Sequence, residues 1–117
     1  MTDKLKNLNL TQSAYDFADV LKLEGAFNEI GEAFRFGLAY ALKINPNIKE
    51  NIGSKEYTKN IADMASIDRE NIFSWTTEHL SNQVEFDDVN KRIRFLGCWG
   101  LNQIESRYWD NDLKTLD

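Results

Sequence analysis

The chain has 117 residues and a formal net charge of −5, with 42% hydrophobic and 28% charged residues. This length is typical of one domain, and the hydrophobic content excludes a wholly disordered protein and suffices for a core without disulfides or metal. Proteins that bind duplex DNA usually carry a basic face, so the acidic balance argues against extensive phosphate contact and leaves room only for a small basic patch.

The N-terminal part of the chain predicts an extended segment followed by a helix. Residues 4–11 alternate weakly, with Leu8 and Leu10 on one side, which predicts a short strand or an extended lead-in. Ser13 and Asp16 have the spacing of a capping box, with Asp in place of the usual Glu or Gln. A first helix therefore begins near Ser13, and Gly25 supplies its stop.

A second helix is predicted over residues 28–43. Asn28 can cap its start, and Pro46 ends it because proline disfavours helical geometry at Asn45. Its stretch EAFRFGLAYALK carries apolar residues on every side. A helix of this kind needs neighbours all around it.

One face of the 28–43 helix consists of small residues. Ala33, Gly37 and Ala41 lie four apart, so they stack and let another helix backbone approach closely. Gly37 costs about 1 kcal/mol of helix propensity relative to Ala, which suggests that close packing compensates. The other helix belongs either to the same chain, in a monomeric bundle, or to a second copy, in a symmetric dimer.

The second half of the chain predicts three more helices. One follows Ser54, with Tyr57, Ile61 and Met64 at helical spacing, and another follows Asp68 and buries Ile72, Phe73, Thr76 and Leu80. Residues 81–87 are expected to form a turn. From residue 88 onward apolar residues recur at steps of three and four, which predicts a long helix that is interrupted or kinked around Gly97 and Gly100. The alternative for this last segment is a short strand through RIRFLGCW.

Together these elements predict a single domain over residues 1–117 with a mainly α fold. We expect a helical bundle of about five helices packed around the 28–43 helix, with a short N-terminal β-strand as an optional addition. Cys98 is the only cysteine, which indicates a reducing compartment. The start MTDKLKNLNL has no apolar core of a signal peptide, and no stretch approaches the roughly 18 apolar residues of a membrane span. We predict a cytoplasmic protein with no membrane partner.

His79 and Cys98 are the only candidates for nucleophilic catalysis. A hydrolase would need them side by side, and no nucleophile elbow surrounds any serine or the cysteine. Zinc needs more ligands than these two, and the sequence contains no HxxxH or CxxC pair. We therefore predict no catalytic residue, no metal ligand and no cofactor.

The one basic cluster consists of Lys91, Arg92 and Arg94, with Phe95 beside it. Interleaved cations and aromatic rings can hold a nucleic-acid backbone or stack bases. Three charges are few, however, and a solvated stripe that pairs with acids four residues earlier is the favoured interpretation.

Three tryptophans lie in the second half of the chain, and tryptophan is enriched at interface hot spots. Trp109, near the chain end, is the one expected to meet a partner. With the second helix it completes the predicted interface: Ala33, Phe34, Gly37, Leu38, Ala41 and Trp109.

The order of NLNLT, SAYDFADVLKLEG and NEIGEAFRFGLAYALK resembles the ribbon-helix-helix family of DNA-binding regulators. In that family two chains pair their strands into a ribbon that enters the major groove, and the second helices form the dimer core. The resemblance covers residues 7–43 and implies that Asn7, Asn9 and Thr11 face the groove, where asparagine can read adenine edges. The second helix and the ending WGLNQIESRYW are also similar to small helical accessory proteins encoded with bacterial DNA-modification defence systems.

These features favour a non-enzymatic intracellular interaction module that self-associates or docks on a protein partner. The second resemblance implies an accessory subunit of a DNA-acting bacterial complex. The alternative is a dimeric, ribbon-helix-helix-like DNA-binding regulator. A homodimer or a protein partner is therefore expected, and nucleic acid is disfavoured by the net charge.

Overall fold

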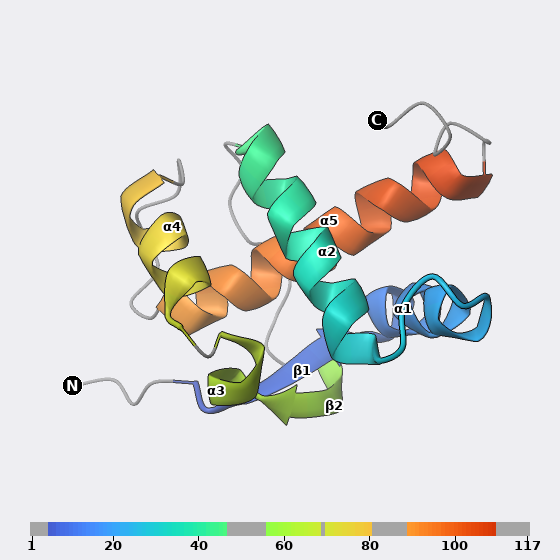
Figure 1. Ribbon diagram of the computed structural model, residues 1–117, viewed down its shortest axis with the longest axis horizontal. Helices are drawn as coiled ribbons and strands as arrows, with labels where there is room; N and C mark the ends of the chain where they lie inside the picture. The colour runs from blue at the N-terminus through green and yellow to red at the C-terminus, as the bar shows by residue number, and fades with distance from the viewer. Residues whose placement is uncertain (1–4, 47–55, 69, 81–88, 110–117) are drawn as a thin grey trace.

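The computed structural model describes residues 5–46, 56–68, 70–80 and 89–109. Helix dominates this part of the chain, as predicted, and a short N-terminal strand is present (Figure 1). The elements in chain order are β1 (Asn7–Thr11), α1 (Gln12–Leu23), α2 (Ile30–Ile44), β2 (Tyr57–Asp63), α3 (Met64–Ile67), α4 (Ile72–Leu80) and α5 (Val89–Trp109).

The starts of the first two helices lie within two residues of their predicted positions. Thr11, not Ser13, caps α1, because its hydroxyl accepts a hydrogen bond from the backbone N–H of Ala14 at 3.4 Å. At the start of α2 the backbone N–H of Glu29 donates to the Glu32 carboxylate at 3.1 Å. At the start of each helix, a nearby side chain therefore accepts a hydrogen bond from a backbone N–H that has no partner within the helix.

The end of α2 confirms the prediction made from Pro46. Asn45 has a φ of 54° and ends the helix in the left-handed conformation, a position that asparagine tolerates better than most residues. The residue before a proline avoids helical geometry, so the chain turns here.

The helix predicted after Ser54 is wrong at its start, because Tyr57–Asp63 forms strand β2 instead. β2 pairs antiparallel with β1, from Asn7 opposite Asp63 to Thr11 opposite Tyr57, with irregularities after Leu8 and after Leu10. The spacing of Tyr57 and Ile61 fits a helix, but pairing with a strand about 50 residues earlier overrides it. β1 thus finds its antiparallel partner in its own chain.

The described residues after β2 are mostly helical, and the last helix is continuous. α5 runs from Val89 to Trp109 without the interruption predicted at Gly97 and Gly100, and the alternative strand through residues 92–99 is absent. The predicted turn over residues 81–87 lies outside the described residues. In the part of the chain that the structure describes, no helix is both long and apolar enough to cross a bilayer.

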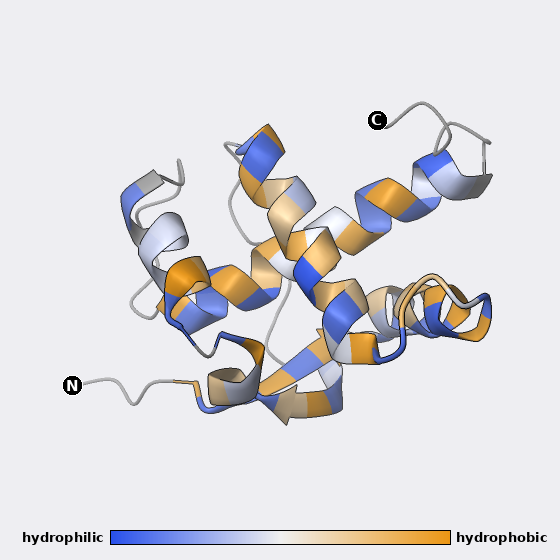
Figure 2. Ribbon diagram, in the orientation of Figure 1, coloured by the Kyte–Doolittle hydropathy of each residue, from blue (hydrophilic) through white to orange (hydrophobic). Residues whose placement is uncertain are grey.

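The glycines of α5 lie where α2 crosses this helix, and they allow the two helices to approach closely. α2 crosses α5 at Gly37 and Gly100, where a Cβ added to Gly100 would lie only 1.9 Å from the Gly37 carbonyl oxygen. A Cβ on Gly97 would lie 2.2 Å from the Phe34 ring. Hydrophobic residues of both helices gather at the crossing (Figure 2). The small-residue face of α2 is therefore filled by α5 of the same chain.

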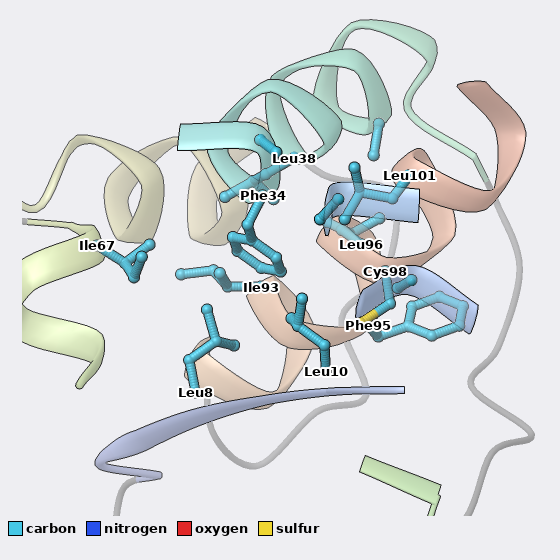
Figure 3. Close-up of a cluster of buried hydrophobic side chains, with 14 of the residues drawn as sticks. Leu8, Leu10, Phe34, Leu38, Ile67, Ile93, Phe95, Leu96, Cys98 and Leu101 are labelled. Carbon is cyan, nitrogen blue, oxygen red and sulfur yellow. The ribbon is translucent and has the colours of Figure 1, made fainter. Parts of the chain in front are cut away.

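The expected packing of all helices around the 28–43 helix is not confirmed. α2 has an exposed side that includes Phe36 and Ile44, whereas residues 92–98 of α5 are all buried, a full helical turn with neighbours on every side. Figure 3 shows Phe34 of α2 pointing toward Ile93 of α5, with Leu8 and Leu10 of β1 beneath them. The core thus lies between α2, α5 and the sheet.

A side-chain contact joins the end of α1 to the last turns of α5. The Tyr108 hydroxyl donates a hydrogen bond to the Glu24 carboxylate, and the Tyr108 ring meets the edge of Phe17 at a centroid distance of 5.6 Å. The hydrogen bond to Glu24, then desolvation and the Glu24 charge, raise the pKa of the Tyr108 phenol above 10.0.

This shift predicts how the contact responds to alkali. Because the folded-state pKa is raised, the stabilisation from the contact is present below pH 10.0 and is lost as the pH rises through the folded pKa. Glu24→Ala is expected to lower the pKa of Tyr108 toward its ordinary value, whereas Glu56→Ala, at an exposed site near β2, is expected to leave it unchanged. A titration of the tyrosine Cζ chemical shifts by NMR measures both. An unchanged Tyr108 curve in Glu24→Ala would contradict the contact.

Candidate functional site

The predicted interface residues of α2 lie inside the molecule. Ala33, Phe34, Gly37, Leu38 and Ala41 are all buried in the same chain, beneath or beside α5. A partner has no access to them in this fold. Trp109 is the last residue of α5, and its side chain lies outside the described residues.

The strand residues implied to face a DNA groove have structural partners. Asn9 donates to the Tyr57 carbonyl at 3.3 Å and accepts from the Asn60 side chain at 2.8 Å, so it links β1 to β2. Thr11 is buried as the cap of α1. Asn7 is exposed at the start of the strand.

The solvated stripe predicted at the basic cluster is wrong for both arginines. Arg92 and Arg94 are only 2% and 7% exposed, whereas Lys91 is half-buried. The Arg94 guanidinium lies 3.8 Å from the centroid of the Tyr57 ring, and Arg92 donates to the Pro46 carbonyl at 3.5 Å. The acids four residues earlier lie outside the described residues. In this fold the two guanidinium groups join α5 to neighbouring segments.

The structure does not bring His79 and Cys98 together. Cys98 is buried in the core on α5, whereas His79 is exposed on α4, with its ring centroid 5.0 Å from that of Trp75. Among the described residues no group of three or more His, Cys, Asp or Glu side chains is placed to hold a metal ion.

A polar pocket of about 600 Å³ lies where the start of β1, the α3–α4 connection and the start of α5 meet. Its size falls within the usual range of ligand pockets. Several of its polar groups, however, have structural bonds. Asp68 accepts from the backbone N–H groups of Phe73 and Ser74, both at 2.9 Å, and Asn90 donates to the Leu5 carbonyl at 2.9 Å. These bonds hold the first turn of α4 and dock α5, so Asp68 and Asn90 have structural roles.

The outward side of α4 is the strongest candidate site. Ile72 and Trp75 are 57% and 58% exposed, and His79 is exposed beside Trp75. These three residues, which we call the α4 face, are separated by three and four positions and so share one side of the helix. The opposite side of α4, with Phe73 and Thr77, turns toward the core. Figure 1 shows α4 at the edge of the molecule, beside the first half of α5.

Sequence reasoning placed Ile72 in the core and so missed this site. α4 carries two nonpolar stripes, one through Ile72 and Trp75 and the other through Phe73, and helical periodicity alone does not say which of them faces inward. The presence of two stripes on a nine-residue helix was the available signal.

The remaining large exposed nonpolar side chains of the described residues lie on α1 and α2, and the two that share the exposed side of α2, Phe36 and Ile44, are less exposed than the α4 face, at 40% and 49%. Leu23, at the end of α1, is 77% exposed, and Ile44 lies at the end of α2. Phe36 packs against Phe27 at a centroid distance of 5.4 Å. Leu23 stands alone, and single exposed nonpolar residues are common on protein surfaces, so it carries less weight than the α4 face.

The segment that contains α4 is acidic. Residues 70–90 contain no lysine or arginine and five acids, the first of which, Glu70, is exposed two residues before Ile72. In the sequence this stretch is bounded by Arg69 and Lys91, and Glu70 is its one acid whose side chain the structure describes. No protein-family model, no curated protein and no solved structure matches the chain.

Proposed function

We propose that the protein is a non-enzymatic interaction module that docks on a protein partner through the α4 face. The observation that carries this proposal is the exposure of Ile72 and Trp75 on one side of one helix. Burying a large nonpolar side chain stabilises a complex by about 1.5–3 kcal/mol before the costs of association. Tryptophan is moreover among the residues most enriched at binding hot spots.

The neighbours of Trp75 support this role. The His79 ring lies against the indole at 5.0 Å, one turn further along α4, and limits the space in which the indole can move. A side chain that is already restrained loses less conformational entropy when a partner covers it. The α4 face is thus a preformed anchor.

Site-specific photo-crosslinking tests the proposal in cells that produce the protein. A photoreactive amino acid placed at Trp75 is expected to give a discrete protein adduct on illumination. The same amino acid placed at Leu23, which is even more exposed but lies at the end of α1, is expected to give none. An adduct with twice the mass of the chain would indicate self-association. Failure to form an adduct at Trp75, or equal adducts at both positions, would contradict the proposal.

A further inference from the structure

We infer that the outer side of α2, the side turned away from α5, pairs with the same side of a second copy of the chain, with the two helices antiparallel. Phe36, Ala39 and Lys43 are exposed on this side. Figure 1 shows α2 in front of α5, with no described element in front of it. The surface is distinct from the α4 face, so the inference goes beyond the proposed function and does not rest on it.

The outer side of α2 has the residue spacing of a seam between two helices. Four residues that follow one another at steps of four, three and four lie on it: Glu32, Phe36, Ala39 and Lys43. The a and d positions of a coiled coil recur at these steps, so the four residues form one line along the helix, about 16 Å long. The Phe36 ring packs against Phe27 at a centroid distance of 5.4 Å, which restrains it before a partner covers it.

The order of these four residues makes the seam complementary to itself when the helices are antiparallel. A two-fold axis midway between positions 36 and 39 places Phe36 of one copy against Ala39 of the other, so that a large side chain meets a small one. The same axis places Glu32 of one copy against Lys43 of the other, because both pairs are centred on the same point of the helix. Side-chain size and charge therefore select the same register.

The charges at the two ends of the seam also exclude the parallel arrangement. In a parallel pair Glu32 would face Glu32 and Lys43 would face Lys43, and like charges across an interface disfavour association. In the antiparallel pair each lysine meets a carboxylate. Glu32 uses its Oε1 atom to accept from the backbone N–H groups of Asn28 and Glu29, both at 3.1 Å, and a carboxylate offers a second oxygen to a lysine.

A second copy is the occupant that this arrangement specifies. One helix supplies both members of each contact, as the symmetry of a two-fold dimer requires, and such dimers are the commonest oligomers. The contact consists of one pair of helices and is therefore small, so the dimer is expected to be weak and to form as the protein concentration rises.

Sedimentation equilibrium of the full chain, from low micromolar to near-millimolar concentration, measures the association. The mass is expected to rise from one chain toward two. Phe36→Ser is expected to abolish this rise, whereas Leu23→Ser on α1 and Trp75→Ala on α4 are expected to leave it unchanged. All three positions are exposed, so the variants are expected to keep the fold, and their amide spectra check this.

Charge reversal tests the antiparallel register. Lys43→Glu and Glu32→Lys are each expected to weaken the dimer about tenfold, because each variant places like charges together at both ends of the seam. An equimolar mixture of the two variants is expected to associate as strongly as the parent chain, since unlike charges then meet at both ends. Glu32→Gln, which keeps an oxygen for the helix cap, is expected to restore part of the association when added to Lys43→Glu.

Three results would overturn the inference. One is a parent chain that stays monomeric over the whole concentration range. Another is a dimer that survives Phe36→Ser or is lost equally in Leu23→Ser, because the contact would then lie elsewhere. The third is a mixture of the two charge variants, both folded by their amide spectra, that associates no more strongly than either variant alone.

Discussion

Gly100→Ala is expected to destabilise the protein by about 3 kcal/mol, the upper end of the usual cost of overpacking a core. A Cβ at this position would lie 1.9 Å from the Gly37 carbonyl oxygen and 2.7 Å from its carbonyl carbon. Both atoms belong to the backbone of α2, so no side-chain rotation relieves the overlap. The two helices would have to move apart, and Phe34, which fills the space beside Gly97, would lose its contacts with α5.

Denaturant unfolding measures this effect, and Gly31→Ala is its control. A Cβ on Gly31 meets only the end of the flexible Ile67 side chain, at 3.2 Å. Alanine also favours helix over glycine, so this variant is expected to be neutral or slightly stabilising. Equal unfolding midpoints for Gly100→Ala and the parent chain would show that the close crossing of α2 and α5 does not exist.

Asp68→Ala is expected to cost roughly 2 kcal/mol of stability, because the carboxylate caps α4 from a buried position. It accepts hydrogen bonds from the backbone N–H groups of Phe73 and Ser74, at 2.9 Å each, and from the Ser74 hydroxyl at 2.6 Å. Asp68 is itself buried, and its loss removes the acceptor of these half-buried donors. The variant is also expected to loosen α4 and therefore the α4 face.

Asp63→Ala is the matched control for the cap. Asp63 caps the four-residue helix α3 by accepting a hydrogen bond from the backbone N–H of Ser66 at 3.1 Å, and it is exposed. Its removal is expected to cost about 0.5–1 kcal/mol. Hydrogen exchange of the α4 amides should accelerate in Asp68→Ala and remain unchanged in Asp63→Ala. Equal losses of stability in the two variants would contradict the special role of Asp68.

Local signals in the sequence were sufficient for the elements whose partners are close in the chain or whose ends have strong caps. The extended segment at Leu8 and Leu10, the glycine stop after α1 and the end of α2 before Pro46 all follow from nearest neighbours. β2 was missed because its identity depends on pairing with β1, about 50 residues earlier. No local pattern contains that information.

The arginines and glycines of α5 show a second reason why the sequence alone was not sufficient: their roles depend on neighbours from other elements. Arginines at positions 92 and 94 were expected in water, because a charge is rarely buried without a partner. They are buried because α5 passes between several segments. Arg94 packs on the Tyr57 ring of β2, and Arg92 donates a hydrogen bond to the carbonyl of Pro46, just after α2. The glycines of α5 were interpreted as a kink for a similar reason: their role is visible only when α2 is placed across them.

The candidate site was the least predictable part. Periodicity indicated that α4 has nonpolar residues, but the side that faces water depends on where α2 and α5 lie. Ile72 was therefore assigned to the core, and only the tertiary structure shows that it is exposed.

The crossing of α2 over α5 also affects how the protein folds during its synthesis. Gly37 of α2 is synthesised about 64 residues before Leu101 of α5, which packs against it. At usual rates of translation this interval lasts roughly 3 to 13 s. Throughout that interval the side of α2 that α5 later covers stays exposed on the nascent chain. β1 likewise has no strand partner until β2 has been synthesised. The chain thus completes its core only after Leu101 has been synthesised, and until then its exposed nonpolar surface is prone to aggregation.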